Sequence, residues 1–170
     1  MKIWSLFWRR ALKASHVSLS AIWLGAAVCL VLLALPGASL VGEGIGGITY
    51  CMTLIDDFVI IPTAAVVVVT GIFYGFYTKW GFIRFDWVLV KWVATLLFIG
   101  FGAFFLGPWI DSMDQIAKDL GGLAFEDPRF GAARRNVILW GAIQSVALCA
   151  LVFVSIYKPW GQRESVTPTR

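Results

Sequence analysis

The residues of this chain best suited to chemistry lie on one stripe near its N-terminus. His16, the only histidine, is followed by Ser20 and Trp23 at spacings that place all three on the same face of a helix. An imidazole can ligate a metal or carry a proton near neutral pH. A histidine, a hydroxyl and a large aromatic ring on one face of an apolar helix are typical of a pocket lining rather than of a lipid-facing surface.

The segment that carries this stripe is one of four long apolar stretches. Hydrophobic residues make up 59% of the chain and charged residues 14%, against roughly 25% charged residues in an average soluble domain. The stretches cover about residues 14–35, 49–77, 85–110 and 136–157, and each reaches the roughly 20 residues that a bilayer core requires. Because lipid cannot satisfy exposed backbone groups, all four are predicted to be helices. We therefore expect an all-α polytopic membrane protein, with residues 1–160 forming a single four-helix transmembrane domain.

The regions that flank these stretches predict the orientation of the chain. Residues 1–13 mix aromatic and basic side chains, which is typical of an interfacial helix that lies on the membrane surface and runs into the first spanning helix. The two chain ends and the second connection carry nine Lys and Arg residues, against four in the first and third connections. The positive-inside rule then places both termini in the cytoplasm, with residues 161–170 as a polar cytoplasmic tail. The charge pattern gives no indication of nucleic-acid binding.

Lys91 is the expected partner of His16. It lies about six residues into the third stretch and His16 about two residues into the first, so at about 1.5 Å per residue both should lie at a similar depth below the same boundary. Tyr74, near the inner end of the second stretch, could reach the same cavity. The alternative is structural: His16 could lie at the headgroup level, and Lys91 could extend to the same interface.

Asp56 and Asp57 form a second candidate site near the outer end of the second stretch. They could bind a cation or relay protons. They could equally form ion pairs with Arg134 or Arg135 of a neighbouring loop. A short helix over residues 109–120, with an apolar stripe, is expected on the outer surface as a cap on the bundle.

Helix packing is predicted from proline and glycine. Pro62 predicts a kink in the turn that precedes it, because proline lacks a backbone N–H. Gly71 and Gly75 form a pair with small-residue spacing that allows close helix contact, and Gly100 and Gly102 could do the same.

Other chemistries find little support in the sequence. Cys29, Cys51 and Cys149 form no CxxC pair and are expected to be small buried hydrophobes, with a Cys29–Cys51 bridge as the alternative. The chain has no second histidine for bis-histidine haem ligation, no HExxH and no plausible nucleophile triad. No catalytic motif indicates an enzyme.

Three segments carry a family resemblance: HVSLSAIWLG (16–25), DDFVIIPTAAVVVVTGIFYG (56–75) and TKWGFIRFDWVLVKW (78–92). They resemble a family of small integral membrane proteins called domain of unknown function 2269, which is grouped with CopD-like membrane proteins. The broader group includes the haem-binding protoporphyrinogen oxidase of bacteria, whose first-helix histidine and third-helix lysine match His16 and Lys91. This chain has Ala26, Ala27 and Val28 where that enzyme has Pro-Arg, so the match to the enzyme is interrupted there.

The resemblance implies a protein of the inner (plasma) membrane of a bacterium that binds haem b. His16 would be the axial ligand, and Lys91 the opposite ligand or the partner of a propionate. The pocket would be lined by Ser20, Trp23, Tyr74 and Trp92.

Two other functions remain open from the sequence. The chain could be a non-catalytic accessory or structural subunit of a larger membrane complex, and a homodimer sharing ligands is also compatible with one histidine per chain. Alternatively, Asp56, Asp57 and His16 could form an ion or proton pathway.

Overall fold

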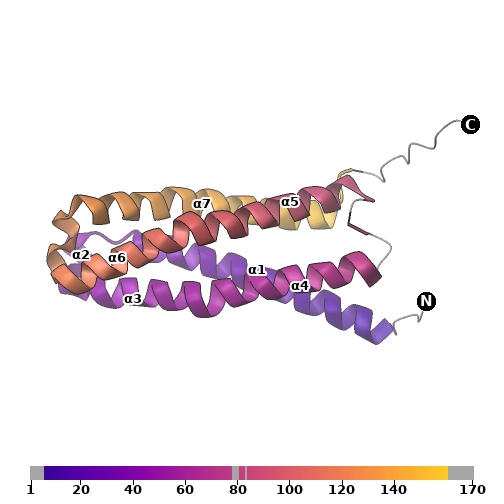
Figure 1. The fold of residues 1–170 in the computed structure, drawn as a ribbon, viewed down its shortest axis with the longest axis horizontal. Helices are drawn as coiled ribbons and strands as arrows, with labels where there is room; N and C mark the ends of the chain where they lie inside the picture. The colour runs from indigo at the N-terminus through magenta and orange to yellow at the C-terminus, as the bar shows by residue number, and fades with distance from the viewer. Residues whose placement is uncertain (1–5, 78–80, 83, 161–170) are drawn as a thin grey trace, which may run out of the picture.

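The structure of this chain is a computed structural model that describes residues 6–77, 81–82 and 84–160, nearly all of them helical. Four helices in these ranges are long and apolar enough to cross a membrane. The helices alternate in direction, so that α1 begins and α7 ends at the same end of the bundle (Figure 1). We call this the proximal end, and the opposite end, where α2 lies, the distal end. The predicted all-α fold with four spans is confirmed.

The elements follow one another without strands in the described helical bundle. They are α1 (Leu6–Ala34), α2 (Ala38–Val41), the 3₁₀ turn η1 (Gly42–Gly44), α3 (Ile45–Ile55), the π turn η2 (Asp56–Ile60), α4 (Ile61–Tyr77), α5 (Asp86–Phe101), the π turn η3 (Gly102–Leu106), α6 (Gly107–Leu120), the 3₁₀ turn η4 (Gly121–Glu126) and α7 (Pro128–Tyr157).

The first helix is longer than the apolar stretch that predicted it. α1 is already helical at Leu6 and runs unbroken to Ala34. Residues 6–13 of the expected interfacial helix are therefore helical and continue without a break into the first span. Arg and Lys are good helix formers, so the basic residues there continue the helix instead of ending it. Residues 1–5 of the expected interfacial helix lie outside the described residues, as does the expected tail at 161–170.

The third and fourth helices also extend beyond their apolar stretches at the distal end. α6 continues the path of α5 through η3 (Figure 1), so the residues expected to form a separate cap lengthen the third helix instead. α7 begins at Pro128, ahead of the predicted start at residue 136. Asp127 caps this helix, because its side chain accepts a hydrogen bond from the backbone N–H of Arg129 at 2.7 Å. Hydropathy alone misses these helix extensions, because the polar residues on one of their faces lower the mean hydropathy of the segment.

Two π turns interrupt the second and third helices at equivalent places. η2 ends at Ile60 and η3 ends at Leu106, and in each case a proline follows two residues later, at Pro62 and Pro108. Proline has no N–H to donate, and its ring crowds the carbonyl four residues back, so the regular pattern of hydrogen bonds cannot continue through it. The irregularity predicted before Pro62 takes the form of a π turn, and the one before Pro108 was not predicted.

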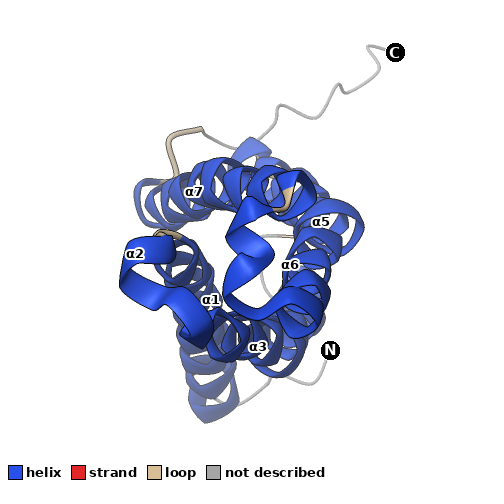
Figure 2. Cartoon of the chain, turned by 90° about the vertical axis from the view of Figure 1, so that its left-hand side faces the viewer, coloured by secondary structure: helices blue, strands red, loops and turns tan. Residues whose placement is uncertain are grey.

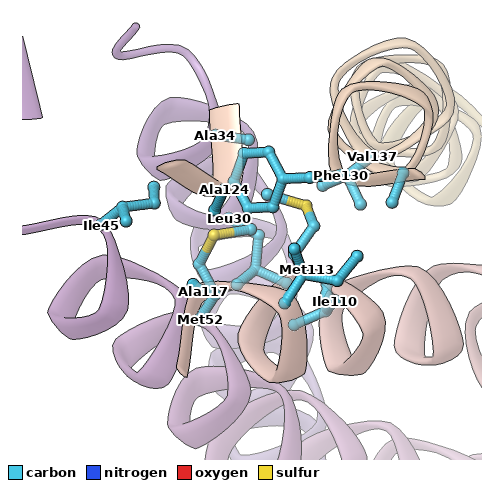
Figure 3. Packing of buried hydrophobic residues seen from close by; sticks show 12 residues of the cluster. Leu30, Ala34, Ile45, Met52, Ile110, Met113, Ala117, Ala124, Phe130 and Val137 are labelled. Carbon is cyan, nitrogen blue, oxygen red and sulfur yellow. The ribbon is translucent and has the colours of Figure 1, made fainter. Parts of the chain in front are cut away.

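The distal half of the bundle has the larger core. α1 packs against both α4 and α7, and α6 packs between α3 and α7, as the view from the distal end shows (Figure 2). The side chains of Met52, Met113 and Phe130 meet at the centre (Figure 3). All three are almost fully buried, so the helix extensions are held together by a hydrophobic core of their own.

The glycine with the least room against a neighbouring spanning helix is not among the four that the sequence singled out. Gly71 and Gly75 face aromatic side chains, and Gly100 and Gly102 have open space where a Cβ would lie. At Gly141 of α7, by contrast, a Cβ would lie 2.9 Å from Cγ2 of Val31 on α1. Gly141 therefore allows α1 and α7 to pack closely.

The three cysteines lie on the outside of the bundle as free thiols. The expectation that they are buried is wrong, and Cys29 and Cys51 form no bridge. A thiol is apolar enough to face lipid, so an outward position in a spanning helix carries little cost.

Replacing Gly141 by valine should weaken the contact between α1 and α7. The side chain of Val31 has one strongly preferred rotamer in a helix, so it cannot easily turn away from the new side chain at position 141. The clash between the two should lower the free energy of unfolding by about 1–3 kcal/mol. The matched control is Gly100→Val, which fills open space and should change stability by less than about 0.5 kcal/mol. Thermal unfolding in detergent measures both variants, and equal stability of the two would contradict the packing at Gly141.

The cap on α7 should be sensitive to acid. The hydrogen bond from the Arg129 side chain to Asp127 lowers the pKa of Asp127 from its ordinary value of 3.8 to about 2. Because the folded pKa is the lower one, the stabilisation is complete above pH 3.8 and is lost as the pH falls through about 2. In Arg129→Met the titration midpoint of the Asp127 carboxyl carbon, followed by NMR, should rise toward 3.8. The control Arg135→Met should leave the midpoint unchanged.

Candidate functional site

His16 is held by a hydrogen bond between the first and second spans. Its Nδ1 lies 2.7 Å from Oγ1 of Thr70 on α4. The same hydroxyl lies 2.8 Å from the carbonyl oxygen of Val66, to which it donates. A hydroxyl has one proton and two lone pairs, so while Thr70 donates to Val66 it accepts a hydrogen bond from Nδ1–H of His16. In the neutral imidazole this tautomer has an unprotonated Nε2, whose lone pair can bind a ligand.

Aromatic rings and a glycine face surround the imidazole. The Tyr74 ring meets the His16 ring edge-on, with centroids 5.6 Å apart. A Cβ at Gly71 would lie 3.4 Å from the Trp92 ring and 3.9 Å from Cε1 of His16. A Cβ at Gly75 would overlap the ring of Phe82. The side of α4 next to His16 is thus flat enough for aromatic rings to lie directly against its backbone.

Lys91 reaches the same region from the third span. Its side chain is half-buried, and it lies close enough to His16 for the two groups to interact electrostatically. The ion pairs found among the described residues do not include Lys91. The structure therefore places Tyr74 against His16 and Lys91 within electrostatic range of it.

Ser20 and Trp23 do not join this group. The Ser20 hydroxyl donates to the backbone carbonyl of His16 at 2.8 Å, so its proton is used within α1. Trp23 lies about two turns further along α1 and is only 3% exposed. It packs in a separate cluster with Ala64 and Val67 of α4. The stripe predicted from the sequence is thus divided between two environments.

Asp56 and Asp57 do not pair with the arginines proposed from the sequence. Arg134 instead donates to the carbonyl oxygens of Ala34 and Leu35, at 2.7 Å each, and so caps the C-terminus of α1. The prediction is wrong because the last carbonyls of a helix are themselves strong acceptors for a cation. Asp57 is exposed and Asp56 half-buried.

Two polar residues were missed by the sequence analysis. Thr70 is the partner of His16, and its spacing of four residues from Tyr74 on one helix face is the signal that could have identified it. Asp114 is 4% exposed, accepts a hydrogen bond from Thr49 at 3.1 Å and forms an ion pair with Lys118. An acidic residue between Met113 and Ile116 in an amphipathic pattern was the corresponding signal.

One hollow in the described structure is an apolar groove of about 460 Å³ on the outside of the bundle. It runs between the third and fourth spans and is lined mainly by leucine and aromatic side chains, among them Phe101, Phe105 and Trp140. His16 does not line this groove. A smaller cavity of about 30 Å³ lies inside the bundle beside Trp23 and Asp56.

Comparisons of the chain with protein-family models, with curated proteins and with solved structures gave no match in any of the three. Four spans of sufficient length and hydropathy identify the chain as a small multi-pass integral membrane protein.

Proposed function

We propose that this protein binds haem, with Nε2 of His16 as an axial ligand. One observation carries the proposal: the hydrogen bond from Nδ1 of His16 to Thr70. A histidine that ligates a metal almost always donates its other ring N–H to a protein acceptor, which fixes the tautomer and the ring orientation. Thr70 is itself fixed by its hydrogen bond to the carbonyl oxygen of Val66. The Nδ1 side of the imidazole is therefore held in place, and Nε2 is left as the nitrogen that would bind a metal.

The surroundings of His16 suit a flat aromatic macrocycle. The face formed by Gly71 and Gly75 already carries the rings of Trp92 and Phe82. A porphyrin would lie against this face, with Tyr74 at the edge of the imidazole, and Phe82 would have to leave Gly75 to admit it. Ser20 and Trp23 are not part of this pocket.

Lys91 would complete the haem site, either by balancing the charge of a propionate or by serving as a second ligand. As an ammonium group it would compensate the charge of a propionate, and as a neutral amine it would be a ligand opposite His16. Its half-buried position near the imidazole supports both roles. Bound haem would supply one-electron redox chemistry in the membrane.

An absorption spectrum of the detergent-purified protein from haem-replete cells tests the proposal. We expect a Soret band that shifts on reduction with dithionite and is largely lost in His16→Ala. The control Ser18→Ala alters an exposed residue of the same helix and should retain the band. A wild-type preparation without a Soret band would refute haem binding, and a band that survives in His16→Ala would refute the ligand.

Thr70 should control the affinity for haem. Thr70→Val removes the acceptor for Nδ1–H and should weaken binding by about 10–100-fold, the usual cost of losing such a partner. Thr70→Ser keeps the hydroxyl and should restore most of the affinity. Thr63→Val is the matched control, because Thr63 lies on the same face of α4 and also donates to its own helix. Haem titration of the apoprotein measures all three, and equal affinities for Thr70→Val and Thr63→Val would contradict the role of Thr70.

A second candidate function is that of a membrane subunit in a larger complex. The apolar groove between the third and fourth spans favours it, because a groove lined with aromatic residues can accept a partner's transmembrane helix. Purification in a mild detergent separates the candidates: a stoichiometric partner supports the subunit, and the isolated protein alone speaks against it.

A further inference from the structure

A small cavity lies inside the bundle where the two π turns face each other. Its volume is about 30 Å³. Asp56 and Ile60, the two ends of η2, line one side, and Gly102 and Leu106, the two ends of η3, line another. Trp23 of α1 and Gln144 of α7 complete the wall, so all four spans contribute to it.

Two of the lining side chains have buried polar atoms without a partner. Nε1 of Trp23 and Oε1 of Gln144 are both inaccessible to solvent and form no hydrogen bond among the described residues. The side chains are 3% and 7% exposed. Buried polar atoms in native proteins are nearly always hydrogen-bonded to protein or to ordered water. Two such atoms on side chains that line one cavity therefore point to a polar occupant.

The irregular backbone explains why space is present here. A π turn carries an extra residue and widens the helix, and Gly102 has no side chain to fill the gap, with nothing within 4 Å of its Cβ position. Both π turns are placed by the prolines that follow them. Pro62 and Pro108 thus create a cavity at one level of the membrane domain.

We propose that the cavity is a binding site for a buried water molecule that joins Trp23, Gln144 and Asp56. Water accepts a hydrogen bond from the indole N–H and donates its two protons to the Gln144 oxygen and the Asp56 carboxylate. The volume exceeds the roughly 10–15 Å³ that one water needs and is too small for a lipid chain or an organic ligand. A cation would meet the positive end of the indole N–H, and an anion would meet two oxygen acceptors.

The bound water gives Asp56 a hydrogen-bonded connection to the interior of the bundle. Asp57 and Asp111 are near enough to this carboxyl to interact with it electrostatically, and both are exposed. Asp56 therefore neighbours two exposed carboxylates and also lines the cavity. This site is separate from His16 and does not depend on haem.

The test is NMR of the full-length protein in detergent with ¹⁵N-labelled tryptophan indoles. The Trp23 resonance is identified by its loss in Trp23→Phe. We expect this indole proton to show a cross-relaxation peak to a long-lived water, whereas the indole of Trp140, which lines the outer groove, should show none. In Gln144→Leu the water peak of Trp23 should be lost. The control Gln115→Leu, at an exposed position, should retain it.

The outcomes that would overturn the proposal are distinct. A Trp23 indole without a water peak in the wild type means a dry cavity, and this result needs no folded variant beyond the assignment. A water peak that persists in a folded Gln144→Leu protein removes Gln144 from the site. For Asp56, the infrared carboxylate band that is lost in Asp56→Asn but kept in Asp57→Asn should shift in Gln144→Leu. An unshifted band removes Asp56 from the site.

Discussion

The structure depends on the requirement that backbone polar groups in lipid be bonded within the chain. Regular helices meet this requirement completely, and two prolines in the second and third spans break it at equivalent positions. The chain responds with a π turn before each proline instead of a sharp break. This keeps the helices continuous, and it leaves a gap where the widened turns meet. The polar interior of the protein is thus a consequence of how its backbone accommodates Pro62 and Pro108.

α1 connects the two sites because it packs on both α4 and α7. Its contact with α4 pairs His16 with Thr70 near the proximal end. Further along, Trp23 reaches the internal cavity, and at the distal end Arg134 of α7 binds the last carbonyls of the helix. The close contact at Gly141 holds α1 against α7 between these points. One helix therefore fixes the relative positions of the ligand site, the cavity and the distal core.

The sequence predicted the features that hydropathy determines. It missed those that depend on how each helix is rotated about its axis and on which side chains pair. The four spans follow from apolar length, and the shared depth of His16 and Lys91 follows from counting residues along helices. The helix ends were missed because amphipathic extensions such as α6 pack on protein and do not need a uniformly apolar surface. The partner of His16 depends on which face of α4 turns toward α1, which spacing alone does not determine. The sequence paired Asp56 with Arg134 because their charges are opposite. Arg134 instead donates to backbone carbonyls at the end of α1, and a pattern of side chains cannot indicate such a backbone partner.

The third span is anchored unevenly along its length. At the distal end α6 is packed between α3 and α7, whereas in α5 the buried residues are Trp87 and Val88 alone. These two residues lie in the first turn of α5, so the third span is packed at its proximal start and again at its distal end, where α6 lies. The part between them, residues 89–101, has no buried residue. Lys91 lies less than one turn from Val88, so its spacing from His16 depends on the packing of the first turn of α5.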